Sequence, residues 1–331
     1  MKAIVYEQYG PPEVLRIKEV ATPVVGEQDV LVRVHATSVN FGDRLARNFR
    51  AVTPGSFNML GLFWLIAKMY FGVRKPKHPV LGSEFSGVVE SVGSKVTAYK
   101  AGDEVFGYLG QKMGAYAEYV RVRESDCIAP KSTGISHDEA AVLPYGAIMA
   151  WHLLQKAGVR RGHRVLVNGA SGGIGSAAVQ IAKHLGAEVT GACGTPRIEY
   201  VRSLGADAVI DYTKEDFTRR GESWDLIVDI RGRLPFAAAV AHLNDYGTLL
   251  SVSFKMRHLL QMLRTSFGGK HRVLCALAPD SSESLRTICE LVENGVLRAP
   301  VIERFAFSDA AAAHRLMEEG RNAGAVVIQG V

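Results

Sequence analysis

The stretch VLVNGASGGIGSAAVQIA, Val165 to Ala182, decides the fold, because it joins a short apolar run to a helical pattern through a glycine-rich turn. Gly172, Gly173 and Gly175 carry no side chain, so the backbone there can approach a pyrophosphate closely. The negative charge of that group would lie against the N–H groups at the start of the helix. The stretch therefore predicts a dinucleotide site between a strand and a helix, in preference to a plain tight turn.

The glycine turn is a variant of the G-x-G-x-x-G fingerprint. The strict pattern would begin at Ala170, so the turn reads A-x-G-x-x-G. The helical pattern after it repeats apolar residues at spacings of three and four and ends at Gly186. We expect the cofactor to contact the turn and the helix start, namely Ala170, Ser171, Gly172, Gly173, Ile174 and Gly175.

The end of the next strand indicates which dinucleotide binds. An NAD site has an acidic residue there for the ribose 2′-hydroxyl, but no carboxylate follows this strand until Glu199. Thr195 can donate a hydrogen bond to a 2′-phosphate and Arg197 can pair with it. The residues expected at this position are Cys193, Gly194, Thr195 and Arg197. NADPH is favoured, the alternative being that Arg197 is only a solvated residue at a helix start.

Further cofactor contacts are expected after the later strands. Tyr212 follows the third strand, where it would reach the adenosine end of the cofactor or stand as a surface tyrosine. The other expected contacts are Ser251, Ser253 and Asn322.

Length and composition limit the class of protein. A chain of 331 residues favours two domains, and the net charge of +6 is too mild to indicate a nucleic-acid partner. The four cysteines are far apart and lack the spacing of a zinc site, so we expect free thiols in a reducing compartment. Since the N-terminus lacks the pattern of a signal peptide, a cytoplasmic location is expected.

The pattern of apolar residues changes twice along the chain. Residues 1–126 show short alternating runs separated by turns, which indicates an antiparallel, barrel-like domain. Residues 127–297 alternate strand and helix patterns, as in a doubly wound parallel sheet. Residues 298–331 return to strand patterns and are expected to complete the first domain. The predicted class is α/β with two domains.

Four further motifs carry a family resemblance. They are PVLGSEFSGVVESVGSKVTAYKAGDEVFG, GAYAEYV, AAVLPYGAIMAWHLL and SLGADAVIDY. In this order they resemble the medium-chain dehydrogenase/reductase superfamily, in its zinc-free quinone oxidoreductase (zeta-crystallin-like) branch. The resemblance implies a GroES-like catalytic domain over 1–126 and 298–331, and a Rossmann NADP-binding domain over 127–297.

The resemblance also bears on the chemistry. Zinc alcohol dehydrogenases of this superfamily hold their metal with a cysteine and a histidine, and the matching positions here are Asn40 and Ser83. Because neither side chain supplies a thiolate or an imidazole, no metal is predicted. We expect hydride transfer from NADPH to an apolar or aromatic acceptor, a quinone or an α,β-unsaturated carbonyl. The alternatives are an NAD(P)-dependent alcohol dehydrogenase and a cofactor-binding scaffold with little turnover.

Three residues are expected to be catalytic by the same resemblance. Asn40 and Asp43 would lie beside the nicotinamide, where Asn40 can hydrogen-bond a ribose hydroxyl or the acceptor oxygen. Asp43 is equally well explained as a helix cap. Tyr145 could donate a proton to the reduced acceptor, although a packing role is favoured.

Two other features concern partners. The apolar stretch from Phe57 to His78 is too short and too interrupted to span a membrane. It is read as a substrate lid, as a cover of the core, or as a peripheral membrane contact. The apolar run from Arg272 to Ala278 is expected to be an edge strand through which the chain forms a homodimer.

Overall fold

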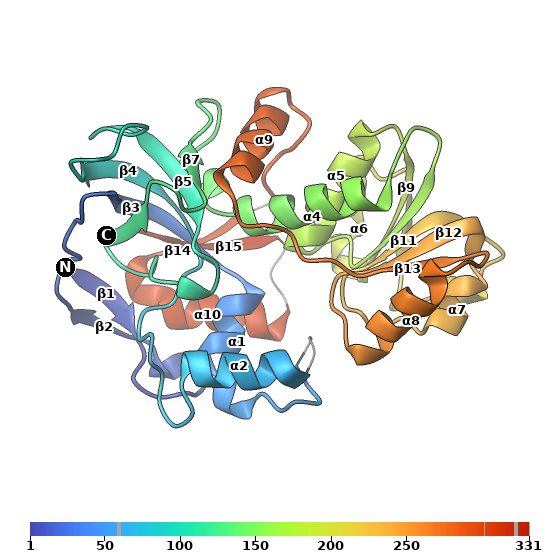
Figure 1. The fold of residues 1–331 in the computed structure, drawn as a ribbon, viewed down its shortest axis with the longest axis horizontal. Helices are drawn as coiled ribbons and strands as arrows, with labels where there is room; N and C mark the ends of the chain where they lie inside the picture. Colours follow the sequence, from blue (N-terminus) through green and yellow to red (C-terminus); the bar gives the residue numbers. More distant parts are fainter. Residues whose placement is uncertain (58–60, 301, 321–323, 331) are drawn as a thin grey trace. The chain divides into compact units, whose positions relative to one another are not determined.

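The computed structural model describes all residues except 58–60, 301, 321–323 and 331. The described chain divides into two compact units. One contains Met1–Thr53, Leu65–Tyr145 and Pro279–Val331, and the other contains Pro54–Trp64 and Gly146–Ala278. Both units combine helices and strands, which confirms the predicted α/β class (Figure 1). The domain boundaries at 126 and 297 stay a prediction.

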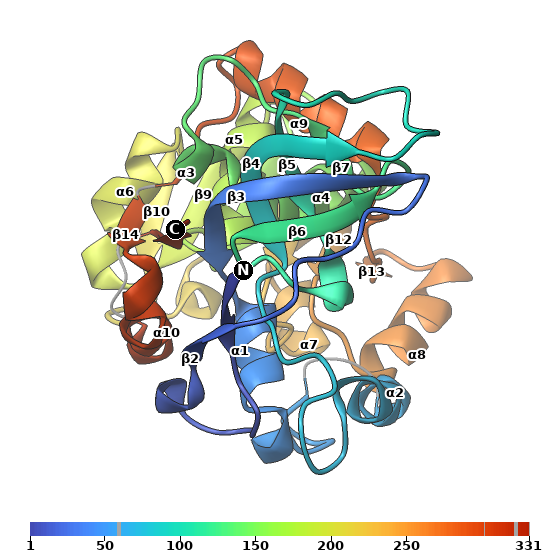
Figure 2. The ribbon, with the colours of Figure 1, turned by 90° about the vertical axis from the view of Figure 1, so that its left-hand side faces the viewer.

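The first unit is built on a seven-stranded sheet of order β14-β15-β3-β4-β5-β7, with β6 also paired to β3 (Figures 1 and 2). Its strands are β3 (Asp29–Val39), β4 (Glu84–Val92), β5 (Glu104–Tyr108), β6 (Tyr119–Arg123), β7 (Ile128–Pro130), β14 (Ile302–Phe305) and β15 (Ala325–Gln329). A separate hairpin joins β1 (Lys2–Val5) and β2 (Arg16–Glu19). Strand β15 pairs with β3, so the end of the chain belongs to the same sheet as its beginning.

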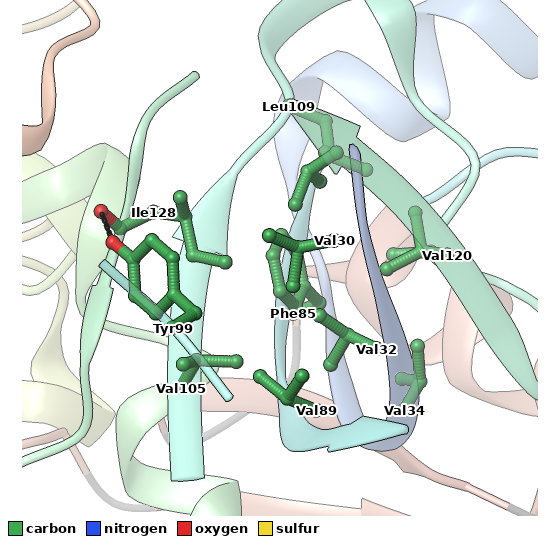
Figure 3. Packing of buried hydrophobic residues seen from close by; sticks show 12 residues of the cluster. Val30, Val32, Val34, Phe85, Val89, Tyr99, Val105, Leu109, Val120 and Ile128 are labelled. Atoms are coloured by element: carbon green, nitrogen blue, oxygen red, sulfur yellow. Dashed lines mark hydrogen bonds between the residues drawn. The ribbon is translucent and has the colours of Figure 1, made fainter. Parts of the chain in front are cut away.

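The core of this unit follows from the alternation along β3. Val30, Val32 and Val34 are buried on one face and pack against Phe85 of β4 (Figure 3). Tyr99 belongs to the same cluster, and its hydroxyl donates a hydrogen bond to the backbone carbonyl of Ile128 at 2.9 Å. The helices of this unit are α1 (Phe41–Arg47), α3 (His137–Ala140), α9 (Ser282–Glu293) and α10 (Ala310–Glu319).

The second unit is a parallel sheet of order β10-β9-β8-β11-β12-β13. Its strands are β8 (Arg164–Asn168), β9 (Glu188–Cys193), β10 (Ala208–Asp211), β11 (Trp224–Asp229), β12 (Leu243–Ser251) and β13 (Arg272–Leu274). Its helices are α5 (Gly173–His184), α6 (Ile198–Ser203), α7 (Phe236–Val240) and α8 (Met256–Ser266), while α4 (Pro144–Ala157) begins at the boundary of the two units. Right-handed crossovers place α5 and α6 on one face of the sheet and α7 and α8 on the other (Figure 1).

The apolar stretch after Phe57 forms helix α2 (Gly61–Phe71). Of its side chains only Ala67 and Phe71 are buried, which does not fit a helix that simply covers a core. No helix in the described part of the chain is long and apolar enough to cross a membrane.

Candidate functional site

The glycine turn lies at the switch point of the parallel sheet. Strand β8 has β9 on one side and β11 on the other, because the chain builds β9 and β10 on one side of β8 before it crosses to β11 on the other. Ligands of doubly wound sheets bind at such a point, beyond the carboxyl ends of the strands. Gly169 follows β8 with a φ of +102°, and a Cβ there would lie 3.2 Å from the Cβ of Ile230, which follows β11. The two turns are therefore packed together.

The start of α5 offers backbone groups to a ligand. Its N-cap is Gly172, so no side chain caps the first N–H groups of the helix. A Cβ on Gly175 would lie 2.1 Å from the Gly169 carbonyl oxygen, so this position needs glycine for packing alone. A Cβ on Gly173 would meet nothing within 4 Å, so space remains open there. Ala170 and Ile174 are buried, and only their backbone can face a ligand.

Two predicted residues meet beside this turn. Nη1 of Arg197 lies 3.4 Å from Oγ of Ser171, although 26 residues separate them. Arg197 is the N-cap of α6, directly after β9, so the end of this strand brings a guanidinium to the glycine turn. An anion bound at the turn would find a positive charge on this side.

The predicted role of Thr195 as a phosphate donor is not supported by its contacts. The Thr195 hydroxyl donates to Oδ2 of Asp211 at 2.6 Å, and the Thr213 hydroxyl donates to Oδ1 of the same carboxylate at 2.6 Å. Hydrogen bonds from Thr195 and Thr213 hold the pKa of Asp211 below its usual range, so this carboxylate is charged. The single hydroxyl proton of Thr195 is therefore already used.

Asp211 is a residue that the sequence argument missed. It ends β10, which pairs with β9 in register Asp211 to Cys193. Since parallel strands end at the same edge of a sheet, an acidic residue at the end of the third strand had to lie beside the end of the second. That alignment was the signal that could have found it.

The remaining residues after β9 face the same edge. Cys193 is buried, and burial raises the pKa of its thiol to about 11, so only its backbone can contribute. Tyr212 is 52% exposed, and its hydroxyl oxygen lies 3.4 Å from the position that a Cβ on Gly194 would take. The tyrosine ring thus stands over Gly194, as a residue near the adenosine end would.

The predicted serines lie at the end of β12. Ser251 is fully buried, and its hydroxyl has no hydrogen-bond partner among the described residues. It pairs in register with Asp229, which accepts from Nδ2 of Asn168 at 3.2 Å. The hydroxyl of Ser253 donates to the Ile230 carbonyl at 3.1 Å. A buried hydroxyl without a partner is costly, and at this edge it is available to a ligand. Asn322 lies outside the described residues.

A second polar cluster lies in the first unit around Asn40. Its Oδ1 accepts from the N–H groups of Gly42 at 2.8 Å and Asp43 at 3.2 Å, which caps α1. Its Nδ2 donates to Oγ of Ser83 at 2.7 Å and to Oε2 of Glu84 at 3.0 Å. Both amide protons and the amide oxygen are thus engaged within the protein. The predicted hydrogen bond from Asn40 to an acceptor would require one of these contacts to break.

Glu84 is the centre of this cluster and was not among the predicted site residues. It is buried and accepts from the Ser38 hydroxyl, from Asn40, and from the Tyr145 N–H at 2.8 Å. Burial raises the pKa of its carboxyl group, and these hydrogen bonds oppose that rise. Ser38, Asn40 and Tyr145 come from three different elements, so one side chain fixes all three.

Asp43 and Tyr145 differ in their access to a ligand. Asp43 is fully buried and accepts from the N–H groups of Asn40 at 3.0 Å and Gly82 at 3.1 Å, so its contacts are those of a structural cap. Burial raises its pKa to about 7, and the nearby Glu84 adds to the rise. Tyr145 is only half-buried, with its ring centroid 5.7 Å from that of Tyr108. Burial, with the charge of Glu84, raises the pKa of its phenol to about 12.

The donor set around Asn40 does not suit zinc. An amide and a hydroxyl stand at positions 40 and 83, whereas zinc in proteins selects thiolate, imidazole and carboxylate ligands. Within the described ranges, no group of three or more His, Cys, Asp or Glu side chains could hold a metal ion.

The fold and the glycine turn define a class: a two-domain enzyme with a GroES-like domain and a dinucleotide-binding Rossmann sheet. Comparison with known families agrees. Residues 26–132 match the family described as "Alcohol dehydrogenase GroES-like domain", and residues 204–328 match the family described as "Zinc-binding dehydrogenase".

Similar proteins extend over the full chain. The 2-methylene-furan-3-one reductase of Solanum lycopersicum is 32% identical over 99% of this chain and 79% of its own length. The mitochondrial NAD(P)H oxidoreductase RTN4IP1 of Mus musculus is 32% identical over 99% of this chain and 89% of its own. The solved quinone oxidoreductase of Coxiella burnetii superposes with a TM-score of 0.84 at 29% identity, covering 100% of this chain and 99% of that one. The chain belongs to the medium-chain dehydrogenase/reductase superfamily, in its quinone oxidoreductase branch, and is an enzyme of that type.

Proposed function

We propose that the protein is an NADPH-dependent, zinc-independent reductase of quinones or α,β-unsaturated carbonyls. The observation that carries this proposal is the hydrogen bond from Asn40 to Ser83, at the two positions where the zinc enzymes of the superfamily place a cysteine and a histidine. Without a Lewis acid, the acceptor must already be electrophilic. Similarity to an enone reductase and to a quinone oxidoreductase supports the same class of acceptor.

The cofactor assignment rests on the second unit. Bound NADPH supplies a hydride from its nicotinamide ring. The open N-terminus of α5 would hold the pyrophosphate, and Arg197 beside Ser171 would pair with the 2′-phosphate. The charged Asp211 accepts hydrogen bonds from the hydroxyls of Thr195 and Thr213, while the Arg197 guanidinium lies against Ser171 of the glycine turn. Similarity to the NADPH-dependent alkenal/one oxidoreductase of Arabidopsis thaliana, at 30% identity, supports this choice.

The first unit supplies positioning. Glu84 fixes Asn40 and the start of α4, and Asn40 in turn directs a hydrogen bond to the oxygen of Ser83. With a pKa of about 12, Tyr145 stays protonated at neutral pH and can donate a hydrogen bond to an acceptor oxygen, but it is a weak acid. We propose that water protonates the reduced acceptor and that Tyr145 orients it.

The direct test is loss of nicotinamide absorbance when NADPH is mixed with a panel of quinones and enones, with and without a chelator. Turnover that is unchanged by the chelator is expected. Asn40→Ala should lower kcat at least about tenfold, since it removes the amide that holds Ser83 and Glu84. Asn294→Ala, at an exposed position, is the matched control. NADPH that binds while no acceptor is reduced would favour the scaffold alternative.

An alcohol dehydrogenase is the second candidate, because one matched family description names alcohol dehydrogenase and the other names zinc-binding dehydrogenase. It predicts NAD(P)⁺-dependent oxidation of alcohols. If a chelator abolished this activity, the zinc-free assignment would be wrong. The proposal also includes a cytoplasmic homodimer paired through β13, which is one of the two edge strands of the described parallel sheet.

A further inference from the structure

Helix α8 is apolar on two opposite sides. Leu259 and Met262 turn inward, toward a buried cluster that contains Phe254, Val273 and Cys275. The outward residues are Met256, Leu260, Leu263 and Phe267, each more than half exposed, with Phe267 at 85%. These four positions are spaced i, i+4, i+7 and i+11, so they form one continuous stripe. The packing of the unit accounts for the inner side of α8 and leaves this α8 stripe facing solvent.

Helix α2, like α8, has apolar residues both on a buried side and on an exposed side. Within the helix, Leu62, Leu65, Ile66 and Met69 are exposed at spacings of i, i+3, i+4 and i+7, with Leu62 at 66%. On the opposite side Ala67 and Phe71 are buried, and the Phe71 ring lies 5.3 Å from that of Phe49. We call these four exposed residues the α2 stripe. Contiguous exposed apolar surface of this kind marks an interaction site more often than chance exposure does.

The two stripes lie in segments of the sequence whose charged residues are all basic. The sequence contains no Asp or Glu between Asp43 and Glu84, and none between Asp245 and Asp280. Each stripe lies inside one of these two acid-free segments. Basic residues in these segments include Lys68 within α2, Arg74, Lys75 and Lys77 after it, and Lys255, Arg257 and Arg264 at and along α8.

Arg257 and Arg264 are placed to work with the α8 stripe. They follow Met256 and Leu263 by one position each, so they lie on one flank of the stripe at a spacing of i and i+7. Both are exposed, and neither has an ion pair within 4.0 Å among the described residues. Long basic side chains beside an apolar face can reach phosphate groups while the apolar residues enter the acyl region.

We propose that the α2 and α8 stripes are contact surfaces for an anionic lipid bilayer. The apolar residues would insert at the level of the headgroups, and the flanking arginines and lysines would pair with lipid phosphates. A second copy of this chain is a poorer occupant, because it would bring the same positive segments against these ones. The inference is independent of the proposed activity, since lipid binding is measured without cofactor or acceptor.

The test is co-sedimentation of the full chain with sucrose-loaded vesicles, made either of phosphatidylcholine alone or with phosphatidylglycerol. We expect binding to the anionic vesicles that weakens with salt. Leu260→Ser with Leu263→Ser should lower the partition coefficient about tenfold, because two half-exposed leucines lose their apolar transfer. Leu65→Ser with Met69→Ser should act likewise. Ile17→Ser with Val24→Ser, which changes exposed apolar residues elsewhere, should bind like the wild type.

The charge contribution has its own variant. Arg257→Gln with Arg264→Gln should lower binding to anionic vesicles about tenfold or more, at about 1 kcal/mol for each basic residue, and should leave the weak binding to neutral vesicles unchanged. Arg160→Gln with Arg161→Gln, a basic pair outside both segments, is the matched control.

Several outcomes would overturn the proposal. One is a wild-type chain that fails to sediment with anionic vesicles, and another is equal binding to neutral and anionic vesicles. A third is a stripe variant that binds lipid normally but changes its sedimentation coefficient, which would make the stripe a subunit contact. Circular dichroism of each variant checks that the exposed substitutions leave the fold intact.

Discussion

The contribution of Asp43 to the stability of the protein is predicted to fall as pH rises from about 4 to about 7. Burial raises the pKa of this carboxyl from 3.8 to about 7 in the folded state. Above pH 3.8 the unfolded chain has released the proton, whereas the folded protein keeps it until about pH 7. Folding therefore takes up a proton in this range, and the free energy of unfolding decreases as pH rises. About three pKa units at about 1.4 kcal/mol each give about 4 kcal/mol.

His314 contributes with the opposite sign in an overlapping range. It is buried between Tyr116 and Arg47, and burial, with the charges of Arg47 and Arg44, lowers its pKa from 6.5 to about 3. Below pH 6.5, His314 binds a proton in the unfolded chain but stays neutral in the folded protein, so the free energy of unfolding decreases as pH falls. Because the two groups oppose each other, the wild-type curve alone does not isolate Asp43.

The assay is therefore a difference between two curves. Urea unfolding of the wild type and of Asp43→Asn is followed by fluorescence from pH 4 to pH 8, in the same buffers. The variant stays uncharged at every pH, so it lacks the titration while His314 is unchanged. A constant offset between the curves is expected, since an amide nitrogen cannot accept from the Gly82 or Asn40 N–H. The test is therefore how the difference in the free energy of unfolding between wild type and variant changes with pH.

The expected difference, wild type minus variant, falls by about 4 kcal/mol between pH 4 and pH 7 and is flat above. Asp245→Asn, at an exposed position, should give a curve parallel to the wild type. A wild-type minus Asp43→Asn difference that does not change with pH would refute the reasoning. It would mean that the backbone hydrogen bonds to Asp43 offset the effect of its burial on the pKa.

Three further predictions follow from the second unit. Arg197→Ala should raise the Kd of NADPH about tenfold to a hundredfold and leave the Kd of NADH unchanged. The matched control is Arg202→Ala, at an exposed position, and equal effects of Arg197→Ala on both cofactors would contradict the 2′-phosphate assignment. Gly175→Ala should lower the free energy of unfolding by about 2 kcal/mol or more, because the new Cβ would lie 2.1 Å from the Gly169 carbonyl oxygen. Gly173→Ala should leave the free energy of unfolding nearly unchanged, and equal stabilities of the two variants would contradict the packing argument. Sedimentation should show a homodimer at micromolar protein, and a monomer would contradict pairing through β13.

The fold could be predicted from the sequence because its signals are local. The apolar strand before Gly169, the turn, and the amphipathic helix after it each repeat over a few residues, and the structure shows β8, the turn and α5 in that order. The pairing of β15 with β3 joins residues almost 300 positions apart, and the return to strand patterns after residue 298 was the only sequence sign of it.

The candidate site was less predictable, because its contacts are not local. Thr195 was read as a phosphate donor because no carboxylate follows it closely in sequence. Its partner Asp211 is 16 residues away and is brought to it by the parallel pairing of β10 with β9. The family resemblance assigned Asn40 a hydrogen bond to a ribose hydroxyl or to the acceptor, but its partners Ser83 and Glu84, more than 40 residues away, come from the turn before β4 and from β4 itself.

The helix stripes show a related limit. A repeat of apolar residues predicts that a helix has an apolar face, but α2 and α8 are apolar on two sides, and only packing decides which side is buried. For α2 the inner side holds Ala67 and Phe71, and the larger apolar set faces solvent. The sequence supported a lid, a core cover and a membrane contact, and the exposed fractions of these side chains give the membrane contact its strongest support.

Glu84 is the shared hydrogen-bond acceptor of the polar cluster in the first unit. Its carboxylate accepts from Ser38 on β3, from Asn40 at the start of α1, and from the N–H of Tyr145 at the start of α4. Removing it leaves three donors without this partner, of which Ser38 is buried and Asn40 and Tyr145 are partly buried, at about 1–3 kcal/mol for a fully buried donor, less the cost of burying the carboxylate itself. The effects of Asn40→Ala and Glu84→Ala should therefore not add, because each single change already breaks the bond that the two residues share. If the double variant lost as much activity as the sum of the two single losses, Asn40 would act on the acceptor by itself and not as part of this cluster.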